Sequence, residues 1–183
     1  MIFPLLAFSA EDKYIIDKSH FAVGFLVEHV GYAKTLGMFR DIDGSYSHDL
    51  TNNKINDINI SIKTGSVFTN HDKRDQHLMS PDFLNVDKFP EMLFKATDIN
   101  IKDDITTING ELTLLGITKP LILTGKINKI GKYPFGGIIK PYVMGISARG
   151  TIKRSQHGMN YALKDDLVGD EIDLIIEFEA RRQ

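Results

Sequence analysis

The sequence contains no cysteine, which excludes disulfide bonds, thiolate nucleophiles and cysteine-ligated zinc. Stability must therefore come from a packed core, and either a reducing or an oxidising compartment fits this absence. Charge of one sign is not in excess, because 22 basic and 24 acidic side chains leave a formal net charge of -2. The basic residues are spread along the chain, so we expect no nucleic-acid partner. No stretch approaches the roughly 20 apolar residues of a membrane-spanning helix, so we expect no transmembrane segment.

The common catalytic motifs are missing as well. The chain has no G-x-S-x-G elbow, no P-loop and no dinucleotide-binding glycine pattern. None of its six histidines forms the H-E-x-x-H pair of a zinc protease helix. His71 and His77, with Asp72 and Asp75 between them, make only a weak metal motif, so we expect no metal site. A serine–histidine pair assembled from different strands leaves no motif, so an enzyme stays open as an alternative.

The chain of 183 residues is long enough for one sizeable core, and no low-complexity linker divides it. We therefore expect a single domain over residues 11–183. The first ten residues, MIFPLLAFSA, are apolar, end in small residues and precede the charged Glu11. They resemble the second half of a secretory signal without its basic start. Residues 1–10 are thus either a signal-peptide remnant or an N-terminal arm packed on the domain.

Apolar residues recur at every second position from one end of the chain to the other, which indicates half-buried antiparallel strands. The clearest run is EIDLIIEFEA, near the end of the chain. The residues predicted to form the dry faces are Ile58, Ile60, Ile62, Leu121, Leu123, Gly125, Ile127, Tyr142, Met144, Ile146, Ala148, Gly150, Ile152, Ile172, Leu174, Ile176, Phe178 and Ala180.

Turn signals separate these runs, for example Asp43-Gly44 and the segment Gly131–Pro141, which is rich in glycine and proline. Short connections between successive strands predict an up-and-down meander, and closure into a barrel would remove its exposed edges. An open sandwich is the alternative.

Two segments lack this period. The stretch RDQHLMSPDFL, residues 74–84, predicts a helix of about two turns. Within it, Ser80-Pro81 predicts the cap and first position of a second short helix, and we interpret Asp75 as a tie to the barrel wall. The segment His29–Gly37 is expected to form an irregular crossing.

Six pieces of the sequence resemble, in the correct order, the motifs of the YceI-like family of bacterial proteins. The pieces are YIIDKSHFAVGFLVEHVG, LGMFRDIDGSY, RDQHLMSPDFLNVDKFPEMLFKAT, GELTLLGITKPLIL, SARGTIKRSQHGM and VGDEIDLIIEFEA. They span almost the whole chain, from Tyr14 to Ala180. The sequence departs from the family pattern at Gln156-His157, where aspartate-phenylalanine is typical, and at Met159, where an aromatic residue is typical.

The resemblance implies an all-β fold, an eight-stranded antiparallel lipocalin-like barrel with an elongated apolar channel that binds polyisoprenoids or related amphiphilic lipids. It also implies a periplasmic or secreted bacterial protein, often a homodimer, with no established reaction. A cytoplasmic location would follow if residues 1–10 are not a signal remnant.

The dry faces mix small and large residues, so they can line a lumen without filling it, although a filled core would use the same residue types. The candidate channel-lining residues are Phe25, Phe39, Phe68, Phe83, Met92, Phe94, Met144 and Ile146. His29, Arg74 and His77 are candidates for a polar mouth, because arginine offers a fork of donors and histidine a switchable donor or acceptor.

We therefore expect a protein that carries, stores or sequesters a long-chain lipid, for instance under stress. The lipid would be held non-covalently and would be a polyisoprenoid, an isoprenoid quinone or a fatty acid or amide. No other cofactor is expected. The alternatives are an enzyme that acts on a bound lipid and a structural or interaction domain.

Overall fold

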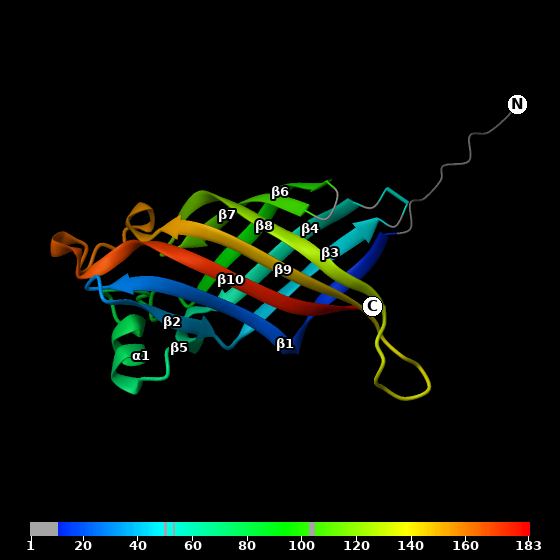
Figure 1. Cartoon of the computed structure of the whole chain (residues 1–183), viewed down its shortest axis with the longest axis horizontal. Coiled ribbons are helices and arrows are strands. Elements are labelled where there is room, and N and C mark those ends of the chain that lie inside the picture. The colour runs from blue at the N-terminus through cyan, green and yellow to red at the C-terminus, as the bar shows by residue number, and fades with distance from the viewer. Residues whose placement is uncertain (1–10, 50, 53, 103–104) are drawn as a thin grey trace, which may run out of the picture.

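The computed structural model describes residues 11–49, 51–52, 54–102 and 105–183. The predicted signal remnant or arm, residues 1–10, lies outside the described residues. Eight strands within these ranges close into an antiparallel barrel, which Figure 1 shows from the side. The order around the ring is β1–β3–β4–β6–β7–β8–β9–β10, and β10 pairs with β1 to complete it. The predicted eight-stranded barrel is therefore confirmed, and the open sandwich is excluded.

The ring strands are β1 (Glu11–His29), β3 (Ile42–Asp49), β4 (Lys54–Lys63), β6 (Glu91–Lys102), β7 (Ile105–Leu114), β8 (Ile117–Lys132), β9 (Tyr142–Lys153) and β10 (Val168–Arg182). Two further strands, β2 (Ala33–Phe39) and β5 (Val67–Phe68), extend the sheet beside β1. Three short 3-10 turns also occur, η1 (Thr64–Ser66), η2 (Arg154–His157) and η3 (Lys164–Asp166).

The predicted alternation is confirmed along the strands. In β10, Leu174 pairs with Phe25 of β1 on one side and with Gly150 of β9 on the other. Because side chains alternate between the two faces of a strand, every second residue of β10 points into the barrel. All five predicted dry-face residues of this strand, Ile172, Leu174, Ile176, Phe178 and Ala180, belong to the packed interior.

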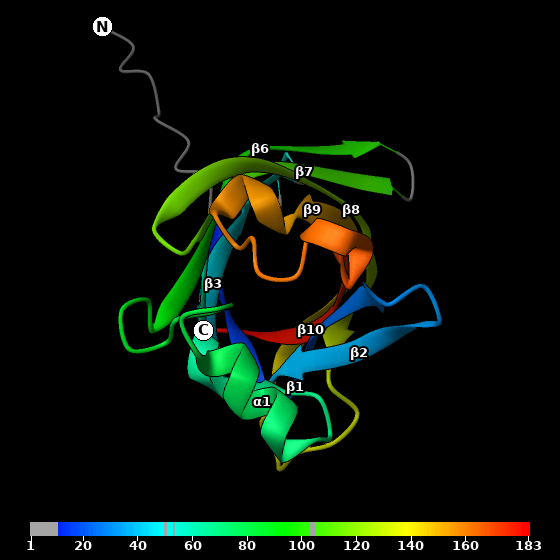
Figure 2. The ribbon, with the colours of Figure 1, turned by 90° about the vertical axis from the view of Figure 1, so that its left-hand side faces the viewer.

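One α-helix occurs within the described ranges, α1 (Asp72–Met79), and Figure 2 shows it beside one end of the barrel. The prediction of a second helix at Ser80-Pro81 is wrong. Ser80 is the C-cap of α1, and its backbone N–H donates to the carbonyl of His77. Its own carbonyl accepts from the N–H groups of Phe83 and Asn85, so the chain turns here without starting a new helix.

Two other local predictions are wrong. Asp43-Gly44 lies within β3, where Gly44 pairs with Ile60. A Cβ atom on Gly44 would lie 2.5 Å from Cδ1 of Ile60, so glycine serves close packing between strands here and not a turn. The segment His29–Gly37 is a tight hairpin turn followed by β2, because Val30 and Gly31 both adopt positive φ, of 53° and 70°.

A bulge interrupts β1 near its middle. Ile16 pairs with Ala180 and Phe21 pairs with Phe178, so residues 17–20 stand opposite the single residue Glu179. The bulge separates the part of β1 that pairs with β3 from the part that pairs with β2.

Candidate functional site

The barrel encloses a cavity of about 510 Å³. This volume lies within the range of roughly 300–1,000 Å³ that is usual for small-molecule sites. The inward faces of the ring strands form its walls, and most of the lining side chains are aliphatic or aromatic. Such walls accommodate hydrocarbon and offer few hydrogen-bonding partners to a ligand.

The side chains of β10 show that the interior is not completely filled. Leu174 and Ile176 point into the barrel and line the cavity, yet both are only half-buried. Since their strand is covered on both sides by β1 and β9, the exposed part of each side chain faces the cavity. Other lining residues, such as Leu123 of β8, are 5% exposed and form ordinary core.

One end of the cavity is closed by a second core cluster. It consists of Tyr14, Tyr46, Ile55, Met144, Ile146 and Ala180. The rings of Tyr14 and Tyr46 stack with their centroids 5.2 Å apart, and Met144 has no exposed surface. Burial raises the pKa of the Tyr46 hydroxyl above its usual range, so the packed cluster disfavours a charge on this group.

The opposite end is the mouth. Exposed residues line the cavity there, namely His29, Val30, Arg74, His77, Tyr161 and Leu167. They come from the end of β1, from α1 and from the segment between β9 and β10, and these three parts surround the end of the barrel that faces the viewer in Figure 2. The cavity therefore opens to solvent at this end.

Arg74 and Asp75 fix α1 to the segment that connects it to β5, through one threonine. Arg74 donates from Nε to Thr69 Oγ1 at 2.7 Å and from Nη2 to the Thr69 carbonyl at 2.6 Å. Asp75 is buried and accepts from the Thr69 N–H at 2.8 Å and from its hydroxyl at 2.5 Å. Asp75 therefore has a structural role, but its partner lies in the connection before α1 and not in the barrel wall, where the tie was predicted. Of the guanidinium nitrogens of Arg74, Nη1 makes none of these hydrogen bonds.

His77 links α1 to the segment after β9. Its ring contacts the rings of Phe83 and Tyr161 edge-on, with centroid distances of 5.0 Å to each. Its Nε2 lies 2.9 Å from a carboxylate oxygen of Asp82. These contacts make His77 part of the aromatic wall of the mouth.

Arg154 is a mouth residue that the sequence reasoning missed. It lines the cavity, is 1% exposed, and donates at 2.7–2.9 Å to the backbone carbonyls of Met159, Tyr161, Val168 and Gly169. Burial lowers the pKa of its guanidinium, and the carboxylate of Asp170 partly opposes this shift. The sequence does contain an indication of this position. Arg154 follows Ala148 and Ile152 at even spacing, so period two predicts that its side chain also points into the barrel.

The two departures from the family pattern also lie at this end. The ring of His157 is 2% exposed, and its Nδ1 lies 3.0 Å from the carbonyl of Ile117. Met159 is 5% exposed and lines the cavity. Both residues are thus buried parts of the segment that Arg154 holds in place.

The structure brings most of the predicted site residues together. Of the predicted channel residues, those that line the cavity are Phe25, Phe39, Phe83, Met92, Phe94 and Ile146, and the predicted mouth residues His29, Arg74 and His77 line it as well. Phe68 and Met144 do not line it. Phe68 is stacked under the guanidinium of Arg40 at 4.6 Å, and Met144 is packed in the closed end.

A serine–histidine–aspartate group lies outside this cavity, in the bulge of β1. Ser19 Oγ and Asp17 Oδ2 lie 3.0 and 3.1 Å from the same ring nitrogen of His20, Nδ1. A catalytic triad places the serine on one ring nitrogen and the carboxylate on the other. The group therefore stabilises the bulge and does not activate a nucleophile.

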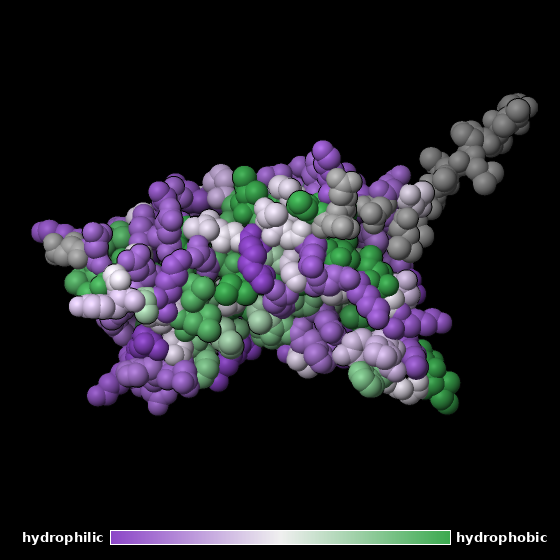
Figure 3. Space-filling model, viewed as in Figure 1, coloured by the Kyte–Doolittle hydropathy of each residue, from purple (hydrophilic) through white to green (hydrophobic). Residues whose placement is uncertain are grey.

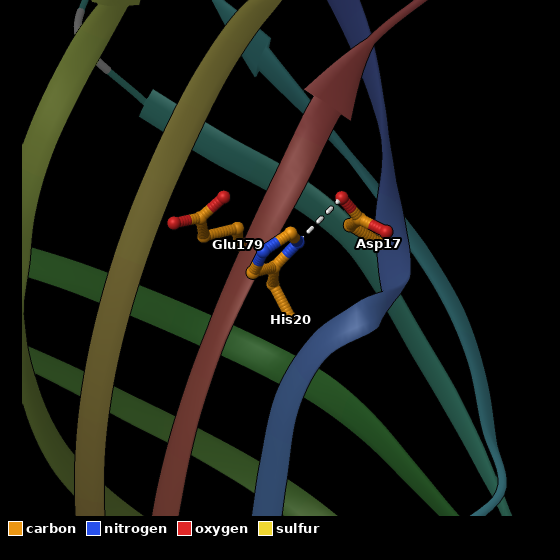
Figure 4. A group of neighbouring side chains, drawn as sticks. All are labelled: Asp17, His20 and Glu179. Carbon is orange, nitrogen blue, oxygen red and sulfur yellow. Dashed lines mark hydrogen bonds and ion pairs between the residues drawn. The ribbon is translucent and has the colours of Figure 1, made fainter. Parts of the chain in front are cut away.

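Glu179 of β10 adds a second carboxylate to this group, as Figure 4 shows. One ligand atom from each of Asp17, His20 and Glu179 lies within 4.8 Å of the others. However, Asp17 already accepts from Arg181 Nε at 2.9 Å and from both donors of Ser19. Burial would raise the pKa of this carboxyl, but its hydrogen bonds to Ser19, His20 and Arg181 outweigh burial and hold the pKa well below its usual range. The guanidinium takes the place of a metal ion, so we assign the cluster a structural role.

Within the part of the chain that the structure describes, no helix is long and apolar enough to cross a membrane.

Comparison with known proteins identifies the family. The model of the YceI-like domain matches residues 14–180. Protein YceI of Shigella flexneri is 39% identical over 191 aligned positions, which cover all of this chain and 96% of that protein.

Solved structures share the barrel. The YceI protein of Campylobacter jejuni superposes with a TM-score of 0.72 at 28% identity, over 85% of this chain and 90% of its own. A polyisoprenoid-binding domain of Saccharophagus degradans, implicated in plant cell wall breakdown, gives a TM-score of 0.70 at 8% identity. That match covers 93% of this chain and 98% of the other, and at this identity it shows the fold alone.

Proposed function

The chain belongs to the YceI-like family, and from this premise and the geometry of its barrel we propose that it binds one long-chain amphiphilic lipid in the cavity. The observation that carries the proposal is an enclosed volume of about 510 Å³ with almost entirely apolar walls. The polyisoprenoid-binding description of the S. degradans domain supports the same class of ligand. Polyisoprenoids, isoprenoid quinones and fatty acids or amides all belong to this class.

The two ends of the cavity give the ligand a direction. The closed end is packed around Tyr46 and Met144, so it suits the end of a hydrocarbon tail. The mouth carries the polar side chains, and the head group belongs there. Among the described residues, the ring of His29 has no hydrogen-bond partner, so His29 and the remaining donor of Arg74 are the proposed head-group contacts.

The tail supplies most of the affinity in this arrangement. Each buried methylene group contributes about 0.8 kcal/mol, so ten would contribute roughly 8 kcal/mol. Ordering a flexible chain and immobilising the complex offset a large part of this. Selectivity should therefore depend on the length and branching of the tail more than on the head group.

The same family membership leads us to propose a periplasmic or secreted location and a homodimeric state. The role would be to carry, store or sequester the lipid, and binding alone suffices for it.

The experiment uses a matched pair of variants on β10. Leu174 faces the cavity, whereas the side chain of the next residue, Ile175, points away from it. Leu174→Trp should fill part of the void and lower the lipid content of the purified protein about tenfold or more, because a tail can no longer thread past the indole. Ile175→Trp should leave it unchanged. Organic extraction followed by mass spectrometry measures the amount and identity of the lipid.

Two results would contradict the proposal. One is a wild-type protein that yields no stoichiometric lipid and takes up neither oleate nor a long-chain isoprenoid alcohol. The other is equal lipid content in Leu174→Trp and Ile175→Trp, which would place the ligand outside the barrel.

A further inference from the structure

The loop between β8 and β9, residues 133–141, projects beyond the closed end of the barrel, as Figure 1 shows. Its tip presents three large apolar side chains to solvent. Phe135 is 73% exposed, Ile138 105% and Ile139 90%. In Figure 3 this tip is visible as an apolar patch that stands out from the body of the protein. Exposed apolar patches of this kind are typical of protein–protein or membrane contact sites.

The loop is built to hold these side chains away from the barrel. The N–H of Tyr133 donates to the carbonyl of Pro141 at 2.8 Å and closes the base of the loop. Lys140 Nζ donates to the carbonyl of Pro134 at 3.1 Å. Gly136 adopts a φ of 120°, which L side chains rarely adopt, so the chain can reverse at the tip without a bulky residue there.

The charge around the loop has one sign. The segment from residue 126 to residue 142 contains Lys126, Lys129, Lys132 and Lys140 and no acidic residue, in a chain whose net charge is -2. Within the described ranges, Lys129 and Lys132 form no ion pair.

The acidic side chains of the neighbouring strands do not cancel this charge. Three of them already pair with arginines, Asp12 with Arg182, Asp17 with Arg181 and Glu177 with Arg149. Glu179 of β10 lies in the groove beneath the loop, and the exposed Glu11 of β1 accepts from Asn56.

We propose that this loop docks the protein onto a lipid bilayer that carries anionic head groups. Phe135, Ile138 and Ile139 enter the boundary between head groups and acyl chains, and the lysines contact the head groups. In this orientation the closed end of the barrel faces the bilayer, and the mouth beside α1 faces away from it. The rim of the mouth fits such a surface less well, because the exposed carboxylate of Glu28 there forms no ion pair among the described residues.

The sequence contains no tryptophan, so a single introduced tryptophan reports its own surroundings. Ile138→Trp places the probe at the loop tip, and Tyr32→Trp places it at an equally exposed position, 92%, on the β1–β2 turn near the mouth. With phosphatidylcholine–phosphatidylglycerol vesicles, the emission of Ile138→Trp should shift to shorter wavelength and be quenched by brominated acyl chains. Tyr32→Trp should show neither effect. Quenching of the probe at position 32, or of neither probe, would overturn the proposal.

Two further variants test the chemistry of the contact. Ile138→Ser combined with Ile139→Ser should weaken binding to these vesicles about tenfold or more.

Lys129→Glu combined with Lys132→Glu should remove most of the preference for vesicles with phosphatidylglycerol over pure phosphatidylcholine, whereas Lys164→Glu beside the mouth should not. Unchanged vesicle binding by the double-serine variant would refute the proposal. So would a double-serine variant that loses only self-association in sedimentation experiments, because the tip would then contact a second copy. These readouts do not depend on the lipid inside the barrel.

Discussion

The side chain of Arg154 carries a charge into the barrel wall, and four backbone carbonyls satisfy it in place of a carboxylate. All four belong to residues 159–169, the segment that covers part of the mouth. Burying a charge costs free energy unless hydrogen bonds compensate it. Removing the arginine costs free energy as well, because its carbonyl partners are then left without a donor. Arg154 therefore couples the stability of the fold to the shape of the mouth of the cavity.

Replacing this residue should expose that coupling. We expect Arg154→Met to lower the free energy of unfolding by about 3 kcal/mol or more, because four backbone carbonyls, one buried and three part-buried, lose their donor. Urea denaturation measures the change. The adjacent Lys153 is 53% exposed, and Lys153→Met should stay within about 0.5 kcal/mol of the wild type. A loss of less than about 1 kcal/mol in Arg154→Met would show that the segment holds its shape without the arginine.

Period two predicts which face of a strand a residue occupies, but not how far along the barrel it lies. Met144 was assigned to the channel on this basis. It does point inward, but it sits at the packed end. Phe68 belongs to a strand of two residues, too short for any periodicity, and it lies on the outer side under Arg40. Position along the axis depends on strand tilt and register, which only the closed sheet determines.

At the scale of elements, the bulge in β1 is held by Asp17. Its carboxylate accepts from Ser19 and His20 within the bulge and from Arg181 on β10. These bonds hold the pKa of the carboxyl below its unfolded value. The resulting stabilisation is fully present above the unfolded pKa of about 4 and is lost as the pH falls below it.

This predicts a pH-dependent effect of Asp17→Asn. At pH 7 the variant should be less stable than the wild type by about 2 kcal/mol, because the charged acceptor of Arg181 is gone. The difference should shrink between about pH 4 and pH 2, because the Asp17 carboxyl of the unfolded wild-type chain takes up a proton there while the folded one stays ionised. Urea unfolding at both ends of this range measures it, with the exposed Asp98→Asn as the control. A difference that is the same at pH 7 and pH 2 would mean that the charge of Asp17 does not contribute.

The sequence predicts strands well where apolar and polar residues alternate over a long run. It predicts turns and helix ends poorly, because the same residue type occurs in more than one kind of local structure. Gly44 indicated a turn, but glycine also permits close packing between strands, which is its role opposite Ile60. Ser80-Pro81 indicated a helix start, but serine also suits the end of a helix and proline the turn that follows. For Gly44 the deciding contact, Ile60, lies on another strand, which the local sequence does not reveal. For Ser80 the bonds to His77, Phe83 and Asn85 decide, and serine and proline suit both a helix start and a helix end.

For the whole molecule, closure depends on the pairing of β1 with β10, whose partners lie more than 130 residues apart. Strand patterns alone left an open sandwich as an alternative, and the order of the six family motifs favoured the barrel. The sequence could not decide whether the interior was full or hollow. Both use the same apolar residues, and the half-buried state of Leu174 and Ile176 appears only once the ring is closed.

A hollow barrel makes stability depend on its ligand. A lipid that binds the folded barrel and not the unfolded chain adds about 2.7 kcal/mol when it is present at 100 times its Kd. For a domain of 183 residues this corresponds to a rise in Tm of about 5–10 °C. We therefore expect extracted protein to melt about 5–10 °C below the loaded protein and to recover when the extracted lipid is returned, in differential scanning calorimetry. Leu174→Trp should melt at the same temperature with and without added lipid, since the tail cannot enter. Equal melting of extracted and loaded wild-type protein would show that the cavity contributes nothing to binding, whatever lipid copurifies with the chain.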